Sequence, residues 1–130
     1  MSYRLKIAEL DVLGKGKFQN ASGRTECAEF IRQATGAPPT ISWRKGLKVA
    51  DAKLGQILRG TAIATFDDNG KYPIDGLGKH AAIYLSHSEA NIQVLDQWDA
   101  QGEVKPRAIS FKRPKGTRRS NDAKTFFVIE

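Results

Sequence analysis

The chain is poor in the residues that build disulfides and metal sites. Its 130 residues include one cysteine, Cys27, and two histidines, His80 and His87. A single cysteine excludes an internal disulfide and a cysteine-rich zinc site, so a metal would need clustered carboxylates. Because the sequence shows no such cluster, we expect a protein without a metal or another cofactor.

Long apolar runs are also absent. Residues 1–7 lack the apolar core and the small-residue cleavage site of a signal peptide. No stretch approaches the roughly 20 apolar residues of a membrane span. We therefore expect a protein that is synthesised in the cytoplasm, has no membrane partner and folds as one domain over residues 1–130.

Acidic residues are outnumbered, and the formal net charge is +7. Such a charge attracts polyanions, whether nucleic acid, an anionic envelope polymer or an acidic protein. Residues 105–119 carry seven lysines and arginines and no acidic residue. Nucleic acid is not the expected partner, because this stretch has Phe111 as its one aromatic residue and because no recognition-helix or zinc pattern is present.

Local patterns predict one helix followed by strands. The helix extends over residues 25–35, with Thr25 as its N-cap and Gly36, followed by two prolines, as its stop. Strands are predicted over residues 61–66, 80–85, 91–98, 107–111 and 125–129. We expect an apolar segment and a loop ahead of the helix, and a helical turn near residues 52–58. This order of elements predicts an α+β fold with a mostly antiparallel sheet.

Cys27 lies in the first turn of the predicted helix, and His80 begins the second predicted strand. The positive end of a helix dipole lowers the pKa of a thiol, and a nearby imidazolium holds the thiolate. These are the requirements of a cysteine nucleophile and its general base. The alternative is a small buried cysteine, since Cys27 shares a helical stripe with Ile31 and Ala34. His87 lies in a polar turn, where we expect it to be exposed to solvent.

The next predicted strand offers a third group, of the kind that orients the imidazole in such sites. Asp96 and Gln97 lie there and face opposite ways by strand alternation. Asp96 is the stronger candidate, because a carboxylate in an apolar strand needs a partner, either His80 or a lysine or arginine. Gln97 is the second candidate for this role and is also assigned to substrate binding.

Three aromatic residues are candidates for the walls of a substrate groove. Trp43 and Trp98 offer ring faces that suit sugar or peptide contacts, although tryptophans also fill cores. Tyr84 shares the strand face of His80 by alternation, so it either borders the site or fills the core.

Four features together resemble a known superfamily. They are the helix start at residues 26–30 (ECAEF), the strands at residues 60–66 (GTAIATF) and 80–84 (HAAIY), and Asp96 on the following strand. These features resemble the papain-like NlpC and CHAP amidases and endopeptidases. More closely, the chain resembles a small bacterial family of compact amidases related to type VI secretion amidase effectors, and the resemblance covers residues 22–129.

The resemblance implies a papain-like fold, in which the helix that carries the cysteine packs on a mostly antiparallel sheet of five or six strands. It also implies hydrolysis of amide bonds in peptidoglycan stem peptides, in which Cys27 attacks the carbonyl carbon, His80 takes and returns the proton, and Asp96 holds the imidazole. An effector of this kind has a cognate immunity protein in the producing cell. It reaches the periplasm of a target cell through a dedicated secretion system.

Two other functions fit the same residues. Acyl transfer would pass through the same thioester and would differ in the group that attacks the acyl-enzyme. A basic, non-enzymatic binding module for an anionic polymer or an acidic partner protein would leave Cys27 inert. Its affinity would fall steeply as the salt concentration rises.

Overall fold

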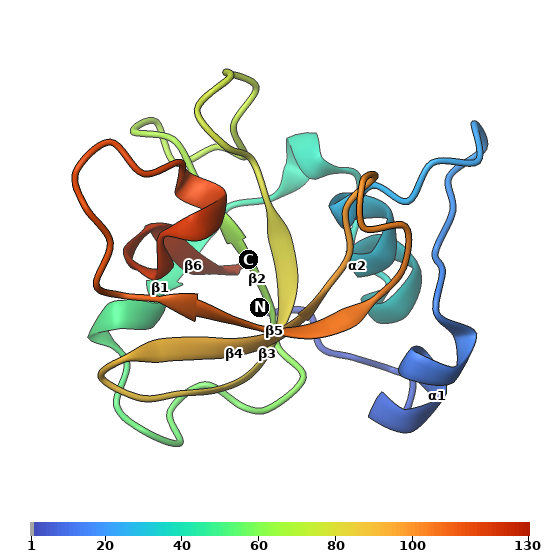
Figure 1. Cartoon of the computed structure of the whole chain (residues 1–130), viewed down its shortest axis with the longest axis horizontal. Helices are drawn as coiled ribbons and strands as arrows, with labels where there is room; N and C mark the ends of the chain where they lie inside the picture. The colour runs from blue at the N-terminus through green and yellow to red at the C-terminus, as the bar shows by residue number, and fades with distance from the viewer. Residues whose placement is uncertain (1) are drawn as a thin grey trace.

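The strands of this chain form one antiparallel sheet. The computed structural model describes residues 2–130, and its six strands are ordered β1-β6-β2-β3-β4-β5 (Figure 1). The strands are β1 (Lys45–Lys48), β2 (Ala62–Thr65), β3 (Ala81–His87), β4 (Asn91–Asp96), β5 (Lys105–Ser110) and β6 (Phe126–Ile129). Two helices, α1 (Glu9–Lys15) and α2 (Cys27–Thr35), precede them. The predicted α+β fold is confirmed, and every pair of neighbouring strands is antiparallel.

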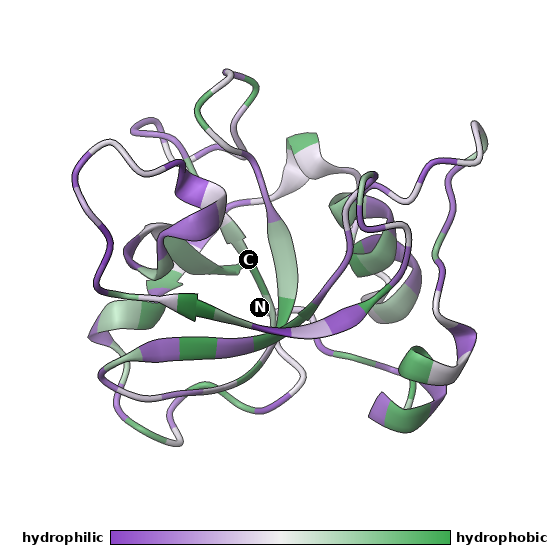
Figure 2. Cartoon of the chain, in the orientation of Figure 1, coloured by the Kyte–Doolittle hydropathy of each residue, from purple (hydrophilic) through white to green (hydrophobic). Residues whose placement is uncertain are grey.

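Strand alternation divides the core into two layers. Ala81 and Ile83 of β3 belong to the layer beneath α2, whereas Ala82 and Tyr84 belong to the layer on the other face of the sheet. The second layer is covered by short turns, including the 3-10 helix at Val49–Asp51. Along residues 91–94 of β4, hydrophilic and hydrophobic residues alternate (Figure 2), and the last three residues of the strand are all buried. The helix that carries Cys27 therefore packs on the strand that follows His80 (Figure 1).

The helix α2 begins at Cys27. Its N-cap is Glu26, which makes no side-chain capping hydrogen bond. The prediction of Thr25 as the N-cap is wrong, because the Thr25 hydroxyl donates instead to the carbonyl of Trp98 at 3.3 Å. The helix ends before Gly36, as predicted, where a φ of 76° favours glycine. It has nine residues, and no helix within residues 2–130 is long and apolar enough to cross a membrane.

Local patterns do not predict two of the elements. α1 forms where they predict an apolar segment and a loop. Its apolar residues do not mark one buried face of a helix, because Val12 is buried while Leu10 and Leu13 stay exposed. β1 forms where they predict no strand, since two of its four residues are lysines and its partner is β6, at the far end of the chain. The helical turn predicted near residues 52–58 is a turn at residues 54–56.

The loop that leads into β3 packs closely on the chain near Arg119. Gly78 has a φ of 104°, and a Cβ there would lie 2.9 Å from Arg119 N and 3.0 Å from Ser120 N. Gly78→Ala is therefore expected to lower the free energy of unfolding by about 1–3 kcal/mol, because backbone atoms cannot yield as a side chain would. Gly76→Ala in the same loop is the control, since a Cβ there meets no heavy atom within 4 Å. Urea denaturation measures both variants, and equal losses would contradict this packing.

Candidate active site

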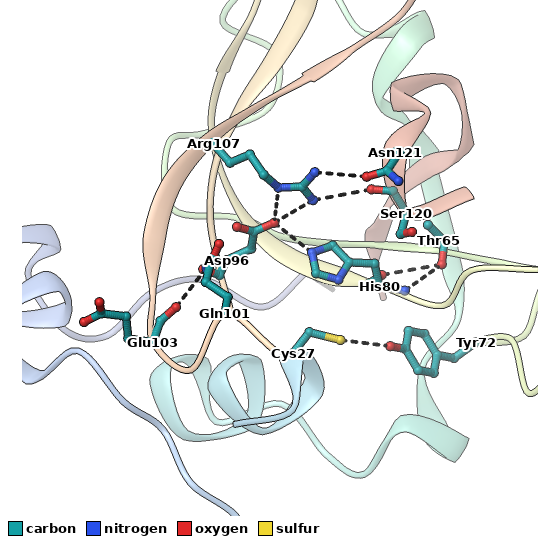
Figure 3. A network of polar contacts seen from close by, with 10 residues as sticks. All are labelled: Cys27, Thr65, Tyr72, His80, Asp96, Gln101, Glu103, Arg107, Ser120 and Asn121. Carbon is teal, nitrogen blue, oxygen red and sulfur yellow. Dashed lines mark hydrogen bonds and ion pairs between the residues drawn. The ribbon is translucent and has the colours of Figure 1, made fainter. Parts of the chain in front are cut away.

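His80 lies immediately before β3 and is held there by its backbone. Its N–H donates to the Thr65 hydroxyl at 3.1 Å, and its carbonyl accepts from the Thr65 N–H at 2.9 Å. The imidazole is buried, and its Nε2 lies 2.8 Å from Oδ2 of Asp96, the last residue of β4 (Figure 3). Since Asp96 engages Nε2, the other ring nitrogen, Nδ1, is the one available to hydrogen-bond the Cys27 thiol.

Asp96 is fully buried, and its Oδ2 accepts from two side chains. Besides His80, Arg107 of β5 donates to it through both Nε and a terminal nitrogen, each at 2.8 Å. The strand register brings the side chains of Arg107 and Asp96 together. Arg107 pairs with Val94, which lies two residues before Asp96, so both side chains lie on the same face of the sheet. Both partners that the sequence offers for Asp96, a histidine and an arginine, are thus present at once.

Cys27 faces His80 from the start of α2. Its Sγ lies 3.5 Å from the hydroxyl of Tyr72, which comes from the loop between β2 and β3 (Figure 3). The Tyr72 ring packs edge-on against Trp43 with the ring centroids 5.0 Å apart. Sequence reasoning missed Tyr72, since it follows a polar turn and no periodicity marks a loop residue as part of a site.

These contacts set the protonation of the site. Burial favours the neutral Cys27 thiol, but hydrogen bonding and charge from His80, together with donors from Tyr72 and the Ala81 backbone, outweigh it and lower the thiol pKa. Burial also opposes a charged imidazole, yet Asp96 and Cys27 raise the pKa of His80 to about 9. Burial and the charge of Cys27 raise the pKa of Tyr72 well above its ordinary value. These shifts favour a thiolate beside an imidazolium over the neutral pair, with the Tyr72 hydroxyl as a donor.

Gln97 does not contact the imidazole or face a groove, so both roles predicted for it are wrong. It is fully buried, and its Nε2 donates to the carbonyls of Phe18 at 2.8 Å and Glu26 at 2.9 Å. Its Oε1 accepts from the Phe18 N–H at 3.2 Å. Gln97 therefore ties an N-terminal segment to the residue that precedes Cys27.

Two of the aromatic residues predicted to line a groove are core residues instead. Trp43 is fully buried, and its Nε1 donates to the Pro38 carbonyl at 2.8 Å. Tyr84 is buried in the second core layer, where its hydroxyl lies 2.6 Å from Nδ1 of His87. Nε2 of His87 in turn bonds the Ala52 carbonyl at 3.1 Å, so His87 is half-buried and held by two contacts rather than freely solvated.

Trp98 does border the site. It is half-buried, and its ring lies edge-on to the imidazole of His80 with the centroids 6.0 Å apart. The guanidinium carbon of Arg107 lies 5.1 Å from the Trp98 ring centroid on the same side of the site. These residues line a cavity of about 320 Å³ together with Lys79, Ser120 and Asn121.

The site offers no ligand set for a metal ion. Within residues 2–130 the structure has no group of three or more histidine, cysteine, aspartate or glutamate side chains that could hold one.

A thiol at a helix start, an imidazole at the start of the strand beneath it and a buried carboxylate on the next strand define the papain-like cysteine hydrolases. Comparison with known proteins agrees with this class and narrows it. The chain belongs to the domesticated amidase effector 2 family, whose model matches residues 10–129. The resemblance to amidase effectors drawn from the sequence is thereby confirmed, and the fold is papain-like.

Two relatives show how far the likeness extends. The chain is 35% identical over 115 residues to a type VI secretion amidase effector 2 protein of Salmonella typhi, covering 81% of this chain and 84% of that one. It is similar to the solved structure of a type 6 secretion amidase effector 2, with a TM-score of 0.76 and 30% identity. That match covers 95% of this chain and 94% of the other. The likeness thus spans the helices, the sheet and the site.

The hydrogen bonds of Gln97 to Phe18 and Glu26, which form a frame around the start of α2, yield a prediction about stability. In Gln97→Met, the buried polar groups of Phe18 and Glu26 lose their partner, so the free energy of unfolding should fall by about 2 kcal/mol or more. Gln93→Met is the matched control, because Gln93 is exposed on β4, the strand that ends just before Gln97, and its side chain bonds Asn91 alone. Its loss should stay within about 0.5 kcal/mol. Similar losses in the two variants, measured by urea denaturation, would show that Gln97 does not hold this frame.

Proposed function

We propose that this chain is a peptidoglycan amidase in which Cys27 is the nucleophile, His80 the general acid and base, and Asp96 the group that orients the imidazole. Membership in the amidase effector family supplies the class of reaction. The observation that carries the assignment of residues is the position of His80, which lies between the thiol and a carboxylate 2.8 Å from its Nε2.

The first half of the reaction is acylation. The Cys27 thiolate attacks the carbonyl carbon of a stem-peptide amide, and the electrons of the carbonyl move to its oxygen. As the tetrahedral intermediate collapses, the C–N bond breaks, and the His80 imidazolium gives its proton to the leaving amine. The products of this half are a free amine and a thioester on Cys27.

The second half is hydrolysis of the thioester. Neutral His80 removes a proton from water, and the resulting hydroxide attacks the thioester carbonyl. The C–S bond breaks, the acid product leaves, and the thiolate and imidazolium are restored. Asp96 keeps Nε2 occupied throughout, so Nδ1 always faces the reacting atoms.

Donors for the developing oxyanion are present at the start of α2. Cys27 is the first helical residue, and the first N–H groups of a helix have no partner within it. The Tyr72 hydroxyl is a second donor, 3.5 Å from the sulfur. We assign the Cys27 N–H and the Tyr72 hydroxyl to the stabilisation of this charge.

The names of the relatives and the charge of the chain support a substrate and a place of action. Both relatives bear the name of type VI secretion amidase effectors, which supports delivery into a target cell and action on its peptidoglycan in the periplasm. A net charge of +7 favours approach to the carboxylates of the wall polymer. The producing cell then needs an immunity protein, and an acidic one would complement this charge.

The proposal predicts solubilisation of purified sacculi that depends on three side chains. Cys27→Ala and His80→Ala should abolish release of peptides, and Asp96→Asn should slow it about 10²–10⁴-fold, because an amide cannot stabilise the imidazolium as a carboxylate does. Mass spectrometry of the released fragments measures the rate and identifies the new termini, while circular dichroism checks that each variant is folded.

The same experiment separates the alternatives. A hydrolase adds one water for each bond cut, whereas an acyl transferase leaves the acyl group on another amine. A binding module releases no fragments, and Cys27→Ala would bind sacculi with the salt dependence of the wild type. Undiminished release of fragments by Cys27→Ala would contradict the proposal outright.

A further inference from the structure

We propose that the cavity beside His80 is a carboxylate-binding subsite, which holds a free carboxylate of the substrate next to the amide that is cut. The inference rests on the proposed function for the identity of the substrate, since peptidoglycan stem peptides carry free carboxylates close to their amide bonds. The affinity of this cavity for a carboxylate depends on its own lining residues.

The walls of the cavity differ in character. Its volume is about 320 Å³, ample for a carboxylate and the atoms that flank it, and its lining residues are Lys79, His80, Trp98, Arg107, Ser120 and Asn121. The half-buried Trp98 ring supplies an apolar wall, while Ser120 and Asn121 supply neutral polar groups. Lys79 and Arg107 add positive charge. No acidic side chain is among the lining residues.

The charge of Lys79 is not neutralised. Lys79 is exposed, and within residues 2–130 its side chain takes part in no ion pair or hydrogen bond. The acidic residue of the adjoining loop, Asp75, is already paired with Arg119 at 2.7 Å. An ammonium at the rim of a partly enclosed cavity attracts anions more strongly than one on an open surface.

Arg107 places a second donor at the same wall. Its Nε and one terminal nitrogen are engaged by Asp96, which is fully buried behind it. The other terminal nitrogen has the Asn121 side-chain oxygen as its partner at a long 3.3 Å (Figure 3). Because a carboxylate accepts stronger hydrogen bonds from guanidinium than an amide oxygen does, a bound carboxylate would compete well for this nitrogen.

The cavity is also in the right place. His80 lines it and on its other side faces Cys27, so one imidazole separates the cavity from the nucleophile. The backbone of Trp98 is anchored to the same helix start by the hydroxyl of Thr25. An extended chain advances about 3.3–3.6 Å per residue. A carboxylate on the substrate residue adjoining the scissile amide can therefore reach the cavity.

Binding can be tested without any hydrolysis, by titrating N-acetyl-D-glutamate into the protein and recording its two indole N–H resonances by NMR. We expect a saturable shift of the Trp98 signal and none of the Trp43 signal, because Trp43 is buried in the core. The neutral diamide of the same compound should produce no such shift. Lys79→Gln should abolish the shift, while Lys71→Gln, in the same loop but outside the cavity lining, should retain it.

A second readout uses muropeptides before and after amidation of their carboxylates. For wild type and Lys71→Gln, KM for the native peptides should be at least about tenfold lower than for the amidated ones. In Lys79→Gln this difference should shrink, with a larger effect on KM than on kcat. A carboxylate-dependent Trp98 shift without any cleavage would refute the proposed function but not the subsite. Absence of the shift, or a shift that Lys79→Gln leaves intact, would overturn the subsite.

Discussion

The hydrogen-bonded ion pair between His80 Nε2 and Asp96 Oδ2, at 2.8 Å, is the interaction on which the site depends. Burial by itself would keep both His80 and Cys27 neutral, and a neutral thiol is a poor nucleophile. The buried carboxylate and Cys27 together reverse the balance and raise the pKa of His80 to about 9, and the charged imidazole in turn lowers the pKa of the Cys27 thiol. Arg107 in turn neutralises the charge of the buried Asp96 carboxylate, because a buried charge without a partner is costly.

The fold positions the groups of the site through two successive residues at the end of β4, whose side chains point to opposite faces of the sheet. Asp96 closes β4 and points to His80, while the next residue, Gln97, points the opposite way and holds the carbonyl of Glu26. Two successive side chains therefore fix the two halves of the site, the imidazole and the start of the helix that carries Cys27. A shift of register by one residue in β4 would exchange them and lose both contacts.

The sequence predicts the parts of this design that depend on local pattern. A cysteine at a helix start and a histidine at a strand start follow from periodicity and helix stops, and Asp96 follows from the cost of a lone carboxylate in an apolar strand. Alternation tells which side chains share a face but not what covers that face, so it does not reveal that Tyr84 is a core residue. An aromatic ring suits a core as well as a groove, and Trp43 is buried in the core. The contacts of loops and of edge strands arise between distant segments, so β1 and Tyr72 leave no local signal.

The most direct test of the central claim is the rate of Cys27 alkylation by iodoacetamide as a function of pH, in wild type and in His80→Ala. The lowered thiol pKa predicts that the wild-type rate rises at a pH below the value of about 8.5 for a free cysteine, because the thiolate forms as the pH rises through the lowered value. Without His80, burial dominates, and the rise should move above that value. A wild-type profile like that of a free thiol, unchanged by His80→Ala, would contradict the account.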